Sequence, residues 1–191
     1  LSHNTQMFFF EKYNRKIVPY DLVNAFIYQD IKQLPRLEKI TLNFGYPKSK
    51  LKNLLSGLLA LEFITSKKAK ITKSRHLNIF LKIKKGNPVG CKIILKKSTM
   101  YFFYLKLITA VFSKINRPFL YSEQLNWCKS ISFQLKTSLL FSELENQFQV
   151  FKDTPKLDIT LTTNSKSYAE FLFLLKSIKF ILANVTQFGR V

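Results

Sequence analysis

The sequence predicts an α+β fold, a mostly antiparallel sheet with helices packed on one of its faces. Two kinds of hydrophobic spacing support this: alternating segments are typical of half-buried strands, and apolar residues three and four apart are typical of helices. These segments follow one another as strand, helix, two strands, helix, strands and helix, an order typical of α+β layers. At 191 residues the chain is long enough for one sizeable core, so we expect a single domain spanning residues 1–191.

The first elements are a helix and a strand. Apolar residues have helical spacing over Tyr20–Gln29, and this helix should end before Pro35, whose ring disfavours helix at the preceding residue. We expect residues 1–19 to form an N-terminal extension. Leu37–Phe44 then alternates and predicts a strand with a basic outer face. Its inward residues are Ile40, Leu42 and Phe44, and its outward residues are Lys39, Thr41 and Asn43.

A leucine-rich helix should follow the turn at Gly45–Pro47. Ser49 can cap this helix, because a serine oxygen at that position accepts a hydrogen bond from the first turn. The leucines recur three and four residues apart and predict one apolar stripe that packs on the sheet. The stripe consists of Leu51, Leu54, Leu55, Leu58 and Leu59.

A long basic loop is expected between the second and third strands. The second strand begins at Lys70–Thr72, and Val89–Lys96 returns beside it. The connection, residues 73–87, is too long for a tight hairpin turn of about 2 to 5 residues and should protrude. In the returning strand Cys91, Ile93 and Leu95 should face inward, and Lys92, Ile94 and Lys96 outward.

Some of the remaining helices and strands can be predicted from the sequence, and others cannot. Thr99–Phe112 predicts a buried helix, and Ser130–Leu135 and Leu157–Thr163 alternate as strands. A final helix should start at Ser167, which forms a capping box with Glu170. The rest of 119–154 supports no assignment.

Charge gives the clearest functional signal. The net charge is +20, and no Asp or Glu occurs between Glu62 and Glu123, an interval with fourteen Lys or Arg. A one-sign field of this kind repels itself and suits a negatively charged partner, which favours nucleic acid. The outer sheet face collects side chains that can bind phosphates and sugar hydroxyls. They are Lys39, Thr41, Asn43, Lys92, Lys96, Thr160 and Thr162.

Other functional classes find little support in the residues. The longest apolar runs, Met100–Phe112 and Tyr168–Val185, carry internal charges and are too short for a spanning helix of about 20 apolar residues. Nothing at the start has the pattern of an export or import signal. Without an export signal, Cys91 and Cys128 should be reduced and buried, so we expect no structural disulfide. His3, His76, Cys91 and Cys128 lack metal-ligand spacing, so we expect no metal, and we expect no cofactor. No catalytic triad or phosphate-binding glycine loop is recognisable, so we expect no enzyme.

Four segments in order suggest a family. Residues 35–45, PRLEKITLNFG, resemble a strand of the bacterial-type large-subunit ribosomal protein numbered five, which binds 5S rRNA in the central protuberance. Residues 71–75 (ITKSR), 86–92 (GNPVGCK) and 157–163 (LDITLTT) resemble three further motifs of that family. Together they span roughly residues 20–180, and the chain is identified as an organelle-encoded member.

The resemblance implies partners and contact residues. In that family the sheet face and nearby loops grip 5S rRNA, which nominates Lys39, Thr41, Asn43, Lys67, Lys70, Lys92, Thr160 and Thr162 as rRNA-binding residues. The long loop reaches the tRNA in the peptidyl site, which nominates Lys73, Ser74, Arg75, Lys82, Lys84 and Lys85. Neighbouring central-protuberance proteins and a bridge to a protein of the small-subunit head are implied as well. We expect a mitochondrial ribosome, with a plastid or bacterial one as the alternative.

The chain departs from the family pattern in two places. Residues 76–81 (HLNIFL) are more apolar than the family's loop centre, and Asn126–Ser130 replaces a glycine-rich stretch. Two alternative functions stay open. Residues 55–62 (LSGLLALE) loosely resemble the helix of LAGLIDADG-type organellar endonucleases, although Mg²⁺ chemistry needs carboxylates from two such helices. The other is an RNA- or tRNA-binding protein that acts outside the ribosome.

Overall fold

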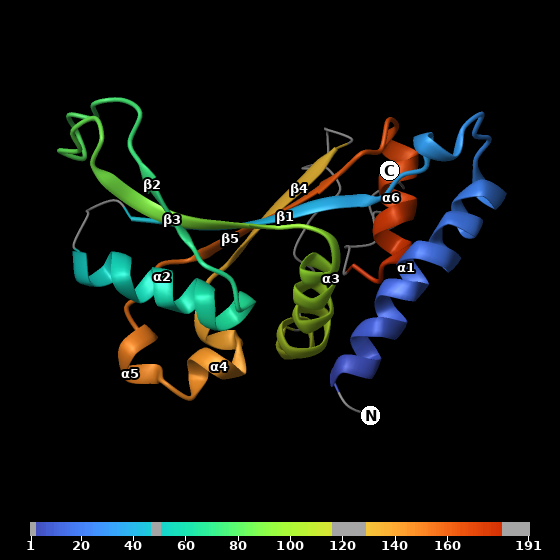
Figure 1. Ribbon diagram of the computed structural model, residues 1–191. Coiled ribbons are helices and arrows are strands. Elements are labelled where there is room, and N and C mark those ends of the chain that lie inside the picture. Colours follow the sequence, from blue (N-terminus) through green and yellow to red (C-terminus); the bar gives the residue numbers. More distant parts are fainter. Residues whose placement is uncertain (1–2, 47–50, 116–128, 181–191) are drawn as a thin grey trace, which may run out of the picture. The chain divides into compact units, whose positions relative to one another are not determined.

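An open antiparallel sheet of five strands is the centre of the fold, in the order β2-β3-β1-β5-β4. The computed structural model describes residues 3–46, 51–115 and 129–180 (Figure 1). The strands are β1 (Leu37–Gly45), β2 (Lys70–Lys73), β3 (Pro88–Leu95), β4 (Ser130–Leu135) and β5 (Leu157–Thr163). The predicted α+β class is therefore confirmed, and the five strands agree with the predicted bounds to within one residue at each end.

Six α-helices accompany the sheet in the described residues. They are α1 (His3–Ala25), α2 (Leu51–Thr65), α3 (Lys97–Lys106), α4 (Ser142–Glu145), α5 (Phe148–Phe151) and α6 (Tyr168–Ser177). Shorter helical turns are Ile31–Gln33, Leu107–Val111, Phe112–Lys114 and Ser138–Leu140. No helix in the described ranges is long and apolar enough to cross a membrane.

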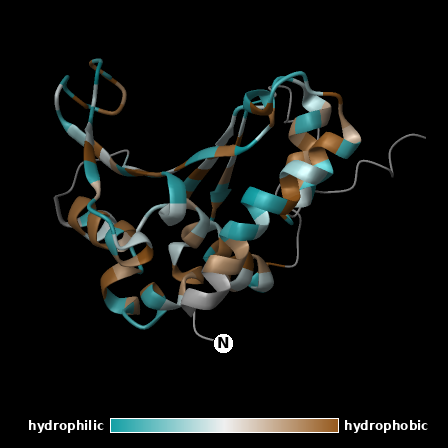
Figure 2. Ribbon diagram, turned by 45° about the vertical axis from the view of Figure 1, so that its right-hand side comes forward, coloured by the Kyte–Doolittle hydropathy of each residue, from teal (hydrophilic) through white to brown (hydrophobic). Residues whose placement is uncertain are grey.

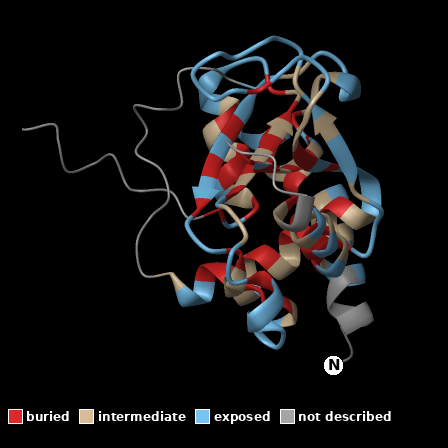
Figure 3. Ribbon diagram, turned by 90° about the vertical axis from the view of Figure 1, so that its left-hand side faces the viewer, coloured by how far each residue is buried: buried red, intermediate tan, exposed pale blue. Residues whose placement is uncertain are grey.

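The chain divides into two compact units. One contains residues 1–39, 96–133 and 161–191, and the other contains residues 40–95 and 134–160. We call them the α1 unit and the hairpin unit. Buried residues run along the strands (Figure 3).

In the α1 unit, helix α1 is longer and earlier than predicted. The expected helix over residues 20–29 is wrong in its bounds, because the helix begins at His3 and ends at Ala25. Val18 and Leu22 are buried four residues apart, and the Phe10 ring stacks on Tyr104 at 5.8 Å. Asn14, on the same side of the helix, donates its amide to the Phe10 carbonyl at 2.9 Å. Asn14 interrupts the row of apolar residues and Pro19 lies within the helix, so the helical spacing cannot be recognised from hydrophobic residues alone.

Aromatic rings fill the core of the α1 unit. Phe112, Phe133 and Phe180 contact one another with ring centroids 5.5 to 6.2 Å apart. The predicted helix over 99–112 is present as α3, and a π turn continues it through Val111. The predicted capping box is also present, since the Glu170 amide donates to the Ser167 hydroxyl at 3.2 Å and the Ser167 amide donates to the Glu170 carboxylate at 3.3 Å.

In the hairpin unit, strands β1 and β3 pair with their apolar residues on the same face. Leu42 lies opposite Ile93, and Phe44 lies opposite Cys91. The inward residues predicted for these strands are at most 4% exposed, which confirms the predicted facing. Helix α2 covers this face so closely at Gly57 that a Cβ there would lie 3.1 Å from the Cys91 sulfur and would overlap the Tyr46 hydroxyl.

The apolar stripe predicted for α2 is only partly correct. Leu54, Leu61 and Ile64 are buried, whereas Leu55 and Leu59 are about half exposed. The helix is rotated so that Gly57 faces the strands, because only a residue without a side chain permits this approach. Ser49 and Pro47, predicted as cap and turn, lie outside the described residues.

The segment between β4 and β5 contains the two four-residue helices α4 and α5, which pack beside α2. The Phe63 ring of α2 meets the Phe151 ring edge-on at 5.9 Å. The hydroxyls of Ser138 and Thr154 lie 2.6 Å apart and join the two ends of the segment.

Candidate nucleic-acid interface

The exposed face of the hairpin unit carries a row of polar side chains across three strands. Lys92 on β3 pairs with Asn43 on β1 and with Lys70 on β2. Residues directly opposite in a sheet project to the same face, so the three side chains lie side by side. Both lysines are exposed and Asn43 is half-buried. Thr41, opposite Ile94, continues the same face toward the start of β1.

The other nominated sheet residues also alternate with buried ones. Thr160 in the hairpin unit and Thr162 in the α1 unit are half-buried positions of β5, whose residues 157, 159, 161 and 163 are buried. Lys39 precedes Thr41 by two residues on β1 and belongs to the α1 unit. Lys67 lies outside the strands, in the exposed connection from α2 to β2.

One carboxylate shares the polar side of β5. Asp158 accepts a hydrogen bond from the Gln134 side-chain amide at 2.7 Å, across from β4. This bond holds the carboxylate beside β4, so it is already occupied within the hairpin unit.

The long loop is an ordered hairpin that prolongs β2 and β3 (Figure 1). The Ser74 amide donates to the Asn87 carbonyl at 2.8 Å, and the Gly86 amide donates to the Ser74 carbonyl at 2.9 Å. Further out, Asn78 and Ile83 exchange two backbone hydrogen bonds of 2.9 and 3.0 Å. We call residues 73–87 the basic hairpin.

A tight turn closes the basic hairpin. The Asn78 side-chain oxygen accepts from the Leu81 amide at 3.1 Å, and the Lys82 amide donates to the Ile79 carbonyl at 3.1 Å. Lys82 and Gly86 have positive φ angles of 54° and 88°. Glycine tolerates this backbone region freely, whereas lysine pays a steric cost there.

Five of the six nominated loop residues are exposed cations. They are Lys73, Arg75, Lys82, Lys84 and Lys85. Within the described residues, no carboxylate forms an ion pair with any of them. Ser74 differs, because its hydroxyl donates to the His76 carbonyl at 2.6 Å and so stabilises the hairpin itself.

Hydrophobic residues lie at the end of the basic hairpin, next to its cations (Figure 2). Leu77, Ile79 and Phe80 are 64%, 78% and 99% exposed, whereas Ile83 is buried and anchors the hairpin. An exposed aromatic ring among cations can stack on an unstacked RNA base, as aromatic side chains of RNA-binding proteins do.

The described residues give little support to a catalytic function. They contain no group of three or more His, Cys, Asp or Glu that could hold a metal ion. The Glu62 carboxylate accepts from the Ala69 amide at 3.0 Å and fixes the exit of α2. Cys91 is fully buried, and burial raises the pKa of its thiol to about 12, so it stays protonated at neutral pH. Cys128 lies outside the described residues.

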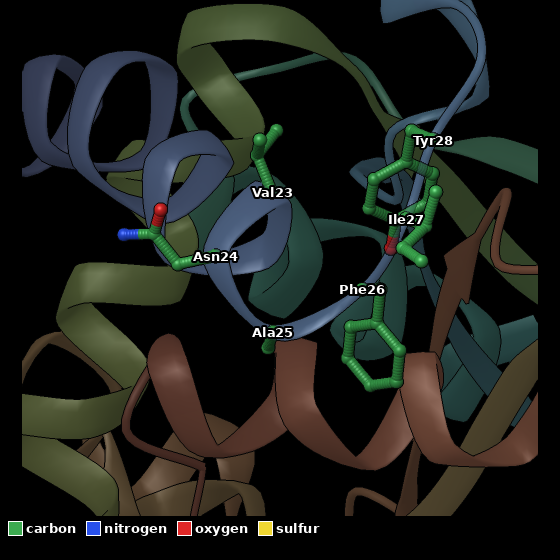
Figure 4. A pocket seen from close by; sticks show the side chains of 6 residues that line it. All are labelled: Val23, Asn24, Ala25, Phe26, Ile27 and Tyr28. Atoms are coloured by element: carbon green, nitrogen blue, oxygen red, sulfur yellow. The ribbon is translucent and has the colours of Figure 1, made fainter.

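A hollow lies at the end of α1 (Figure 4). It is lined by Val23, Asn24, Ala25, Phe26, Ile27 and Tyr28. Burial and the nearby Glu170 carboxylate raise the pKa of Tyr28 to about 12. The lining has no carboxylate, cation or thiol, and its polar side chains are those of Asn24 and Tyr28.

Fold and interface together define a basic α+β protein with a cationic hairpin. The chain is 36% identical over 170 residues to the large ribosomal subunit protein uL5 of Wigglesworthia glossinidia brevipalpis, covering 87% of this chain and 94% of the relative. It is 32% identical over 175 residues to the large ribosomal subunit protein uL5m of Reclinomonas americana, covering 88% and 94%. It is 33% identical over 176 residues to uL5 of Malacoplasma penetrans, covering 88% and 90%.

No family model matches the chain. The identity to these relatives nevertheless extends over nearly the whole length of both sequences. The chain belongs to the uL5 family of large ribosomal subunit proteins, as the four motifs predicted.

Proposed function

We propose that this chain is a structural, non-enzymatic protein of the large ribosomal subunit that binds ribosomal RNA through the exposed face of its sheet. The observation that carries the proposal is the row of Lys70, Lys92 and Asn43 across three strands. Two ammonium groups and an amide on one surface suit phosphate and sugar oxygens. The near-complete coverage of uL5 relatives supports the ribosomal setting.

The RNA bound by this face is 5S rRNA or the RNA that replaces it. Its contact residues are Lys39, Thr41, Asn43, Lys67, Lys70, Lys92, Thr160 and Thr162. The lysines neutralise phosphates, and the hydroxyl and amide side chains accept or donate at sugar hydroxyls, which distinguish RNA from DNA.

The basic hairpin contacts tRNA in the peptidyl site. Its cations Lys73, Arg75, Lys82, Lys84 and Lys85 are exposed, and the ladder that prolongs β2 and β3 holds them at a distance from the sheet. An ordered ribbon loses less conformational entropy on binding than a flexible loop of the same charge. Ser74 supports this arm through its own hydrogen bond to His76.

The same chain contacts neighbouring proteins of the central protuberance and bridges to the small-subunit head. We place it in a mitochondrial ribosome, with a plastid or bacterial ribosome as the alternative. The likeness to uL5m of Reclinomonas americana supports the first choice, and the likeness to bacterial uL5 proteins supports the second.

Crosslinking in native extract followed by sequencing of the attached RNA tests the proposal. Crosslinks from the sheet face to 5S rRNA and from residues 73–85 to tRNA are expected. Crosslinks to other large-subunit rRNA alone would remove the 5S ligand but keep the ribosomal assignment. Crosslinks to DNA would overturn the assignment, and loss of co-sedimentation with large subunits in high salt would favour a protein that acts outside the ribosome.

A further inference from the structure

The helical side of the hairpin unit is poor in cations. Residues 53–65 of α2 and residues 137–151, which include α4 and α5, contain no Lys or Arg, although the chain has 31. The three helices pack against one another. The charged residues within these two ranges are the acids Glu62, Glu143 and Glu145, and the lysines Lys52 at the start of α2 and Lys152 after α5 lie just beyond their ends. This side is thus opposite in character to the basic hairpin and the exposed sheet face.

Large apolar side chains are exposed on the same helices. Leu55, Leu59 and Phe63 are 53%, 46% and 46% exposed, and their four-residue spacing places them on one face of α2. Phe148 and Val150 of α5 are 56% and 52% exposed. We call these five residues the α2–α5 apolar surface.

Three polar side chains of α2 form hydrogen bonds within the chain. The Ser56 hydroxyl donates to the Asn53 carbonyl at 2.8 Å, and the Thr65 hydroxyl donates to the Leu61 carbonyl at 2.7 Å. Glu62 accepts from the Ala69 amide. With these groups engaged, α2 is apolar on both its strand-facing and its outer side, a pattern typical of a helix that is buried all round.

We propose that the α2–α5 apolar surface docks an amphipathic helix of another large-subunit protein, with an apolar stripe flanked by Lys or Arg. The inference rests on the proposed function, since it places the chain beside such a protein. Apolar side chains fill the centre of a protein interface, and a rim of opposite charge fixes the orientation. Glu62, Glu143 and Glu145 supply the negative part of that rim.

Charge argues against other occupants. RNA and an anionic membrane surface would be repelled by a surface whose charged residues are mainly acidic. A second copy of this chain would place one mainly acidic patch against another, because a two-fold contact uses the same patch of both copies. A basic protein element has no such conflict.

Site-specific photocrosslinking in assembled subunits tests the inference. A diazirine amino acid replaces Leu59 in the full chain, and in a control it replaces Ile94, which is exposed on the sheet face opposite Thr41. Large subunits are isolated, irradiated and digested. Position 59 is expected to yield a peptide of another protein with apolar residues at helical spacing flanked by Lys or Arg, and position 94 is expected to yield rRNA.

Three outcomes overturn the inference. Position 59 could crosslink to rRNA, to a second copy of the chain, or to nothing, while position 94 still crosslinks to rRNA. That combination rejects the docking surface and leaves the proposed function intact. Absence of the chain from large subunits rejects both.

A paired variant gives a second readout. Leu55→Ser with Leu59→Ser should lower the melting temperature of the free chain only slightly, because both side chains are about half exposed. It should lower retention in large subunits after a high-salt wash about tenfold, since an apolar contact is not screened by salt as ionic ones are. The matched control is Ile31→Ser, at an 87% exposed residue of the α1 unit outside both the sheet face and the α2–α5 apolar surface, and it should be retained like the parent chain. Equal retention of all three proteins contradicts the proposal.

Discussion

Lys92 of β3 lies directly opposite Lys70 of β2, so two positively charged side chains are neighbours on the exposed sheet face. Like charges directly opposite in a sheet destabilise it. The pair therefore costs the free chain stability, and an anionic partner relieves the repulsion. Such a conflict between folding and local charge is typical of a binding surface.

Lys92→Thr should separate the two effects. Removing the repulsion should raise the free energy of unfolding by about 0.2 to 1 kcal/mol. The same change removes one phosphate contact, so the log–log salt slope of rRNA binding should fall by about 0.7 to 0.9. Chemical denaturation and RNA binding at several salt concentrations measure the two quantities. Lys152→Thr, an exposed position on the helical side, is the control and should leave the slope unchanged; a variant at 92 that kept its slope would exclude this lysine from the interface.

Neutralising the basic hairpin should affect tRNA and not assembly. In the fivefold variant Lys73, Arg75, Lys82, Lys84 and Lys85 are replaced by Ala. The backbone ladder and the Ser74 to His76 hydrogen bond do not involve these side chains, so the chain should fold and enter large subunits normally. Binding of peptidyl-site tRNA to the ribosomes should weaken and lose salt dependence. Failure of the variant to assemble would show that these cations serve the subunit structure instead.

Ser66 ends helix α2 in a conformation that favours glycine. Its φ angle is 54°, and its amide donates to the Glu62 carbonyl at 2.7 Å, the geometry of a left-handed helix end. Ser66→Gly should therefore raise the free energy of unfolding by roughly 0.5 to 1 kcal/mol. Ser56→Gly in the interior of the same helix is the matched control and should lower it by about the same amount. Equal effects of the two changes in denaturant titrations would refute the cap assignment.

The strands could be predicted because a half-buried strand has only two possible facings. In β1 the buried face is defined by Ile40, Leu42 and Phe44. The alternating residues of the paired strand β3 define its buried face in the same way. Helix α2 has leucine on several sides, so its sequence does not define which side is buried. The decisive residue is Gly57, whose missing side chain carries no hydrophobic signal.

The residues of the candidate site could be predicted from the sequence, but their positions relative to one another could not. Alternation put Lys92 and Asn43 on the exposed face, but only strand pairing shows that Lys70 joins them in one row. The ladder in the basic hairpin also escaped prediction. Its polar and exposed residues have no period-2 burial pattern, and it is stabilised by backbone hydrogen bonds that any sequence can form.

The Cys91 thiol should make the chain sensitive to alkali. Burial raises its pKa from 9.0 to about 12, so above pH 9 the unfolded chain releases a proton that the folded chain retains. Stability is thus fully present below pH 9 and falls as pH rises, by at most about 1.4 kcal/mol per pH unit from this group. Cys91→Ala removes the titrating group, and its stability relative to pH 8 should fall less steeply. Parallel pH profiles from denaturant unfolding would contradict this cause.

Gly57 and Tyr46 should be energetically coupled. Alanine is normally favoured over glycine within a helix by about 1 kcal/mol, yet a Cβ at position 57 would overlap the Tyr46 hydroxyl. Gly57→Ala should therefore lower the free energy of unfolding by about 1 to 3 kcal/mol. Tyr46→Phe removes the obstructing oxygen, so the double variant should recover at least about 1 kcal/mol of that loss. Gly45→Ala, where a Cβ meets nothing within 4 Å, is the control and should show no coupling to Tyr46→Phe. A double-mutant cycle with zero coupling at Gly57 would mean that α2 shifts away from the strands, and that the close approach does not fix the rotation of this helix.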